Sequence, residues 1–170
     1  SHADIESCLK CPAGYWSNKE RIKCEACVAG EYLNLTTKSC TSCGRGRYAP
    51  TPMMEDCLEC RGGYHTRGVE FGAKLCSSCA AGFFSKSPDT VNCSLCIVGK
   101  YSVFGSASCT PCPVGFYSSE NGSAVCQACR AGYFAIHPQS SSCSPCAAGT
   151  VTSSTGQKEC DACARGKFQE

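Results

Sequence analysis

The sequence predicts a small, disulfide-rich, mostly β protein: a linear, rod-like array of short stapled β-hairpin repeats with little or no helix. Three observations carry this prediction. The 170 residues include 20 cysteines, a share typical of disulfide scaffolds. Every cysteine belongs to a C-x-x-C pair, and successive pairs start 16 to 19 residues apart. No segment has apolar residues at helical spacing over the length that a helix needs.

The cysteine pairs divide residues 1–170 into one continuous array of about ten repeats of 16–19 residues, the last of them incomplete. A fixed period of this kind indicates a repeat array rather than a single folded core. The repeats start near Cys8, Cys24, Cys40, Cys57, Cys76, Cys93, Cys109, Cys126, Cys143 and Cys160. Because the last repeat has no closing cysteine, we expect the segment to belong to a longer run of the same repeat.

Two further columns define each repeat. A glycine stands three residues after the second cysteine in all ten repeats, and an aromatic residue follows two positions later in eight of them, as at Gly115 and Tyr117. A polar stretch rich in Gly, Asn, Ser, Thr and Pro then leads to the next cysteine, which is typical of turns. We therefore expect a strand, a turn and a returning strand in each repeat. Since side chains alternate between faces, glycine and ring should share a face, with the ring over a neighbouring disulfide.

Some residues depart from these columns. His65 and Val151 replace the aromatic residue. The sequence around His65 is interpreted as a one-residue slip in the longest repeat, with a bend or contact site as the alternative. In five repeats, the residue between the glycine and the aromatic column is itself aromatic. Its side chain should point to the opposite face of the strand from these two, and the five residues form a possible contact surface. They are Tyr15, Tyr64, Phe83, Phe116 and Tyr133.

The cysteines must compensate for the lack of a core. Ordering a repeat of this size costs about 25 kcal/mol, and the few apolar side chains return much less. A disulfide that closes a loop of about 15 residues contributes roughly 3 kcal/mol of stability.

Zinc ribbons also contain two C-x-x-C pairs. In ribbons, however, short and long spacers between the pairs should alternate, and the spacers in this sequence do not alternate. A thioredoxin-like redox pair needs one such motif in a βαβ context. Disulfides are favoured, without metal or other cofactors.

Charge and the remaining side chains exclude other classes. The formal net charge of +2 argues against a protein that neutralises many phosphates of a nucleic acid. The three histidines do not fall in a pattern with a nucleophile and a carboxylate, and thin hairpins offer no deep pocket. We expect neither catalysis nor nucleic-acid binding. No apolar run reaches the roughly 18 residues of a membrane span.

Residues 109–118 read C-x-x-C-P-x-G-x-Y-S. This unit resembles the cysteine-rich repeats of ephrin-receptor-like and tumour-necrosis-factor-receptor-like ectodomains. The resemblance implies that the second cysteine of each pair bonds the first cysteine of the next pair. The implied bonds are Cys11 to Cys24, Cys27 to Cys40, Cys43 to Cys57, Cys60 to Cys76, Cys79 to Cys93, Cys96 to Cys109, Cys112 to Cys126, Cys129 to Cys143 and Cys146 to Cys160. Cys8 and Cys163 would then pair beyond the ends. Joining the pairs two by two, for instance Cys8 to Cys24, is the alternative.

Disulfides indicate an oxidising compartment, so we expect an extracellular or cell-surface protein that passes through the secretory pathway. Asn34 and Asn121 begin N-glycosylation sequons in predicted turns. Asn92 begins a third sequon. Asn92 is the weakest candidate, because the middle residue of its sequon is a cysteine that should form a disulfide and lie in a strand.

Two functions remain. The first is structural: a segment of a disulfide-stapled, glycosylated rod, stalk or filament whose partners are neighbouring repeats of the same or identical chains. Stacking at the roughly 10 Å spacing of sheet layers would make it about 100 Å long. The alternative is a receptor ectodomain or surface antigen with a protein ligand. The monotony of the repeats favours the structural role.

Overall fold

The computed structural model describes residues 9–12, 15–18, 20–86 and 90–167. Cys8, where the first repeat begins, lies outside these residues. The described chain forms short strands and turns without helix. The strands are β1 Tyr15–Ser17, β2 Cys24–Ala26, β3 Glu31–Asn34, β4 Ser39–Ser42, β5 Arg47–Tyr48, β6 Leu58–Glu59, β7 Tyr64–His65, β8 Ser77–Ser78, β9 Phe83–Phe84, β10 Ser94–Leu95, β11 Lys100–Tyr101, β12 Thr110–Pro111, β13 Phe116–Tyr117, β14 Gln127–Ala128, β15 Tyr133–Phe134, β16 Ser144–Pro145, β17 Thr150–Val151 and β18 Asp161–Ala162.

Each odd-numbered strand pairs antiparallel with the strand that follows it, which gives nine two-stranded hairpins in the described residues. From β5 onward the second strand consists of the two residues between the cysteines of a C-x-x-C pair, as Leu58 and Glu59 lie between Cys57 and Cys60. The mostly β, disulfide-rich fold class that the sequence predicts is confirmed.

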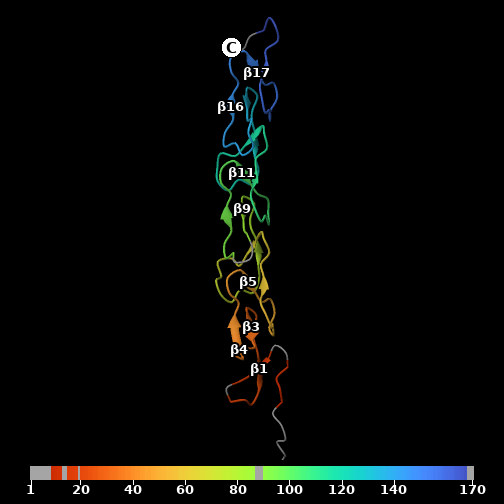
Figure 1. The fold of residues 1–170 in the computed structure, drawn as a ribbon, viewed down its shortest axis with the longest axis vertical. Coiled ribbons are helices and arrows are strands. Elements are labelled where there is room, and N and C mark those ends of the chain that lie inside the picture. Colours follow the sequence, from red (N-terminus) through yellow and green to blue (C-terminus); the bar gives the residue numbers. More distant parts are fainter. Residues whose placement is uncertain (1–8, 13–14, 19, 87–89, 168–170) are drawn as a thin grey trace, which may run out of the picture.

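The hairpins follow one another along a narrow rod with the described chain ends at opposite ends (Figure 1). The strand arrows run along the long axis of this rod (Figure 1). The expectation that neighbouring sheets stack face to face at layer spacing is therefore wrong. Two-residue strands offer too little sheet surface for such layers, and consecutive hairpins are joined instead by backbone hydrogen bonds.

Nine disulfides link the second cysteine of one pair to the first cysteine of the next, with Cα atoms 5.4 to 5.8 Å apart. They are the same nine pairs that the family resemblance implies. The sulfur atoms that a zinc site would need are thus bonded to each other. Cys163 is half-buried and carries a free thiol.

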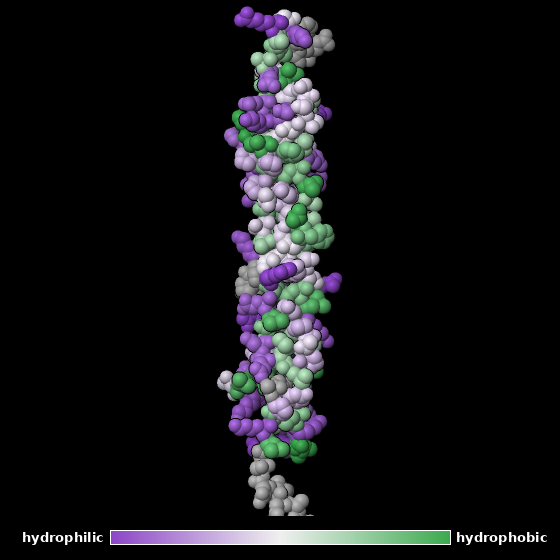
Figure 2. All heavy atoms as spheres, turned by 90° about the vertical axis from the view of Figure 1, so that its right-hand side faces the viewer, coloured by the Kyte–Doolittle hydropathy of each residue, from purple (hydrophilic) through white to green (hydrophobic). Residues whose placement is uncertain are grey.

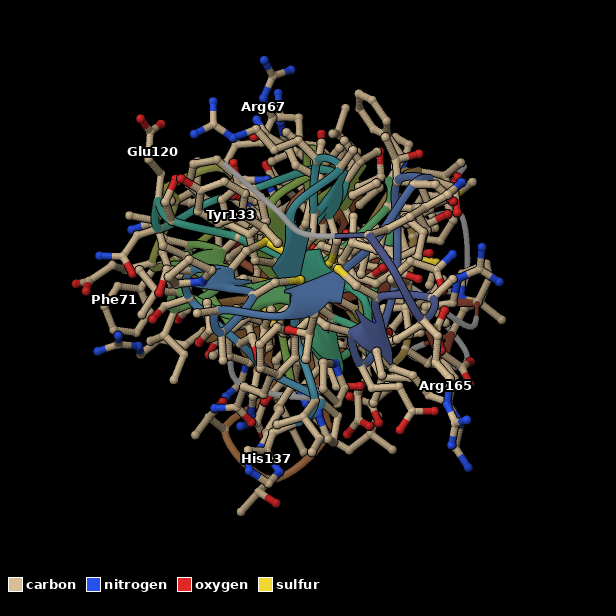
Figure 3. All side chains as sticks on the ribbon, turned by 90° about the horizontal axis from the view of Figure 1, so that it is seen from above. Arg67, Phe71, Glu120, Tyr133, His137 and Arg165 are labelled. Carbon is tan, nitrogen blue, oxygen red and sulfur yellow. A yellow bond between two sulfur atoms is a disulfide. The ribbon has the colours of Figure 1, made fainter. Side chains whose placement is uncertain are left out.

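The core is a thin column along the axis. Seen along the rod, the disulfides lie toward its centre while side chains such as Arg67, Phe71 and Arg165 radiate outward (Figure 3). The second cysteine of each pair from Cys27 to Cys129 is 0 or 1% exposed. The disulfides therefore occupy the place that large apolar side chains hold in an ordinary domain. Among the described residues, no helix has the length and apolar character needed to cross a membrane.

Candidate functional site

The structural feature that recurs along the rod is the joint between hairpins. In one such joint, the Gly82 N–H donates to the Ser102 carbonyl of the next hairpin over 2.8 Å. In return, the Gly105 N–H, at the tip of that next hairpin, donates to the Cys79 carbonyl over 2.9 Å. The first of these bonds recurs from Gly30 to Ala49, Gly63 to Ser85, Gly99 to Ser118, Gly115 to Ala135 and Gly132 to Thr152. The same joint thus repeats through most of the described chain.

Five glycines of the column also contact the hairpin two steps further along, namely Gly30, Gly63, Gly82, Gly99 and Gly115. A Cβ atom on Gly63 would lie 1.9 Å from the Gly105 carbonyl oxygen, and one on Gly115 would lie 2.0 Å from that of Gly156. The φ angles of Gly63 and Gly115, 84° and 81°, also lie in the left-handed region that favours glycine. The space beside the glycine is therefore filled by backbone from a later hairpin. This corrects the expectation that an aromatic ring uses that space.

A buried column of small side chains completes the joint, and the sequence analysis missed it. The residue after the aromatic column is at most 7% exposed in eight consecutive hairpins. Its members are Leu33, Ala49, Thr66, Ser85, Ser102, Ser118, Ala135 and Thr152. The hydroxyl groups of Ser85 and Ser102 donate to the carbonyls of Tyr64 and Phe83 in the preceding hairpin, each over 2.9 Å. The recurrence of Ser, Thr and Ala at this position was the signal in the sequence that could have indicated burial.

The five aromatic residues proposed as a contact surface each begin the first strand of a hairpin and are half-buried. Tyr15 begins β1, Tyr64 β7, Phe83 β9, Phe116 β13 and Tyr133 β15. They belong to five different hairpins spread along the rod. The ring of Phe116 lies close to Gly156. A Cβ atom placed on Gly156 would be 3.5 Å from this ring. This ring therefore packs on the tip of the hairpin two steps further along.

Two of these tyrosines carry a stacked arginine. The Arg61 guanidinium lies 4.5 Å from the Tyr64 ring centre and donates to its hydroxyl over 2.8 Å. Arg130 and Tyr133 repeat this arrangement at 4.4 Å and 2.9 Å. The sequence analysis missed both arginines, although each follows a cysteine and precedes its tyrosine by three residues.

Each arginine and tyrosine pair borders a hollow that is open to solvent. One hollow of about 400 Å³ is lined by Tyr48, Arg61, Tyr64 and Leu75. The other, of about 320 Å³, is lined by Tyr117, Arg130, Tyr133 and Ser142. Tyr48 and Tyr117 come from the preceding hairpin, so two tyrosine rings and a guanidinium meet at each place. Figure 2 shows the exposed apolar residues of one face in separate patches between hydrophilic ones.

His65 lies in the aromatic column without a slip. Tyr64 pairs with Ser78 and His65 with Ser77, the same register as Phe83 with Leu95 and Phe84 with Ser94. The interpretation of a one-residue slip is wrong, because the extra residues of this repeat lie in its turn. There, Arg67 and Gly68 both have positive φ, and the Gly68 N–H donates to the Val91 carbonyl over 3.0 Å.

The three sequons have different surroundings. Asn121 is exposed in a turn, and its Oδ1 accepts a hydrogen bond from the Val98 N–H over 3.0 Å. Asn34 is the last residue of β3 and is half-buried, so its predicted place in a turn is wrong by one residue. Asn92 is exposed in a bend, and Cys93 after it is bonded to Cys79 but precedes β10 instead of lying in it.

A family profile described as tyrosine-protein kinase ephrin type A/B receptor-like matches residues 30–71 and 99–146. Together these segments cover more than half of the chain. No curated protein matches the sequence. The matched residues include hairpins β3–β4, β5–β6 and β11–β12 to β15–β16, with both cysteines of the disulfides Cys43–Cys57, Cys112–Cys126 and Cys129–Cys143. Such disulfide-rich modules are typical of extracellular or cell-surface proteins. The repeated hairpins and the profile together establish that this chain belongs to the ephrin type A/B receptor-like family of cysteine-rich repeats.

Proposed function

We propose that this chain is a segment of an extracellular structural rod, stalk or filament that is made in the secretory pathway and carries glycans. The observation that supports this role most strongly is the repeated joint, in which a hairpin bonds to the next one and, at five places, its glycine contacts the next but one. In an array of this kind length is set by the number of repeats. Adding a hairpin therefore lengthens the rod without requiring a new core.

The partners in this proposal are neighbouring repeats of the same or identical chains and covalently attached sugars. Nucleic acid, catalysis and cofactors have no part in it. The near-neutral charge of +2 and hollows that are open to solvent support these exclusions, because catalytic sites are usually enclosed clefts with convergent polar groups.

The test is to shorten the array in the native polypeptide. Deleting residues 79–111 removes hairpins β9–β10 and β11–β12 and leaves Cys76-Ser77-Ser78-Cys112 as an intact C-x-x-C pair. We expect the extracellular structure that contains the protein to shorten by two repeat lengths in electron micrographs. An unchanged structure would contradict a role in setting length.

A receptor or surface antigen is the second candidate, and the two tyrosine and arginine hollows favour it. Their tyrosines and arginines recur 69 residues apart, at Tyr48, Arg61 and Tyr64 and again at Tyr117, Arg130 and Tyr133. Tyrosine and arginine are among the residues enriched at energetically important interface positions. Replacing Arg61 and Arg130 by alanine should abolish ligand binding in this case and leave the length of the structure unchanged. If the protein is only a structural rod, the same replacements should have no effect on its function.

A further inference from the structure

We infer that the array is a tether of limited length, in which tension passes through the disulfides and cannot unravel the hairpins. This inference rests on the proposed structural role and gives that role a mechanical property. It follows from where the disulfides lie along the chain, so it can be tested on the isolated protein.

The covalent path between the ends bypasses every turn. Each disulfide joins the two ends of a hairpin loop, as Cys112 and Cys126 enclose β13, the turn and the start of the returning chain. A force applied at the ends passes from Cys112 across the bond to Cys126 and then along Gln127 and Ala128 to Cys129. The residues of the turn carry none of this covalent load. Breaking the hydrogen bonds of a joint therefore releases no additional chain.

The segments that do carry the load are already extended. From β6 to β18, the second strand of each hairpin consists of the two residues between the cysteines of a pair. Strands rise about 3.3 Å per residue, against a limit of about 3.6 Å. These strands also run along the rod axis (Figure 1). The C-x-x-C segments themselves consequently have little slack before their covalent bonds are loaded.

The limit can be expressed as a length. One C-x-x-C segment and one disulfide span at most about 16 Å, so the nine disulfides allow about 150 Å between Cys11 and Cys163. Without disulfides, the same 152-residue separation could extend to about 530 Å. The inference thus predicts an approximately 3.5-fold difference in maximal extension between the oxidised and the reduced chain.

Single-molecule stretching measures this difference directly. The full chain, with Cys8 and Cys163 replaced by serine to prevent mispairing, is held by handles at its two ends. We expect the oxidised protein to reach about 150 Å between positions 11 and 163 and then to resist further extension. Dithiothreitol should restore stepwise lengthening: its two thiols become an internal disulfide, and each protein disulfide becomes two thiols.

A variant that lacks one disulfide tests whether the additional extension comes from the loop that this disulfide closes. Replacing Cys112 and Cys126 together by serine should add one step of about 45 Å in the oxidised protein. Gly115→Ala, which disturbs a joint but no disulfide, should add no length. Oxidised protein that lengthens well beyond 150 Å would overturn the inference. That result would leave the rod itself intact, whereas failure of the proposed function would appear in the deletion experiment and leave these extensions unchanged.

Discussion

At the scale of single residues, the glycine after a cysteine pair is constrained by its positive φ angle and by contact with a later hairpin. These two constraints can be separated. Gly115 and Gly132 have nearly the same φ, 81° and 80°, and each donates its N–H to the next hairpin. A Cβ atom on Gly115 would lie 2.0 Å from the Gly156 carbonyl oxygen, whereas one on Gly132 would have nothing within 4 Å. The two positions therefore form a pair that differs in this contact and in one hydrogen bond, which the Gly132 N–H also donates to Thr152 Oγ1 over 2.8 Å.

We expect Gly115→Ala to destabilise its hairpin by about 2 kcal/mol more than Gly132→Ala destabilises its own. Both variants place a side chain at positive φ, which costs about 1–2 kcal/mol, but only Gly115→Ala forces backbone atoms apart, at a further cost of about 1–3 kcal/mol. Amide hydrogen exchange in the two hairpins measures the local free energies of opening. Equal losses at the two sites would show that the contact with Gly156 contributes nothing.

The buried small column gives a second prediction at this scale. Ser102→Phe should destabilise the hairpin by about 3 kcal/mol, because Ser102 is 2% exposed and overpacking of this kind forces the backbone to shift. Ser102→Ala should lose only about 1 kcal/mol, the value of its hydrogen bond to the Phe83 carbonyl. Val103 is 60% exposed, so Val103→Phe is the control and should change stability by less than about 0.5 kcal/mol. Hydrogen exchange that ranks the control with Ser102→Phe would contradict a buried column.

At the scale of the hairpin, the sequence was sufficient for the elements and insufficient for their joints. Cysteine spacing, the glycine column and the turn residues predicted strand, turn and strand, because all three signals are local. The contact between Gly63 and Gly105 joins residues 42 positions apart, and no local pattern reports which backbone approaches a glycine. For the same reason the buried position of Ser102 was missed. His65 was assigned to a slip because the length of a repeat does not reveal whether an insertion lies in a strand or in a turn.

The turns also decide where sugar can be added. We expect glycans on Asn34 and Asn121 more often than on Asn92. Cys93 and Ser94 after Asn92 are held by the disulfide to Cys79 and by pairing with Phe84, whereas Asn121 lies in an exposed turn and uses only its Oδ1 atom. Glycopeptide mass spectrometry of secreted protein measures the occupancy of each site. Ser94→Ala, which removes the sequon of Asn92, should lower the total glycan mass less than removal of either other sequon, and a larger loss would reverse the expected order.

At the scale of the whole molecule, the direction of the strands determines the shape of the rod. If sheets were stacked as layers, each hairpin would add about 10 Å. Because the strands lie along the axis (Figure 1), each repeat instead advances by one C-x-x-C segment, about 10 Å, plus whatever part of a disulfide lies along the axis, up to a total of about 16 Å. The length of the rod therefore depends on the pairs between the hairpins and not on the size of the turns.

This dependence leads to a prediction for the shape in solution. Nine repeats should give a rod of about 90–150 Å and a radius of gyration of roughly 25–45 Å, against about 15 Å for a compact domain of 170 residues. Small-angle scattering separates these values. Deleting residues 79–111 should shorten the rod by two repeats, whereas adding three glycines to the turn between Ser118 and Val125 should leave its length unchanged. A compact profile, or a rod that lengthens with the longer turn, would contradict an axis formed by disulfides and C-x-x-C segments.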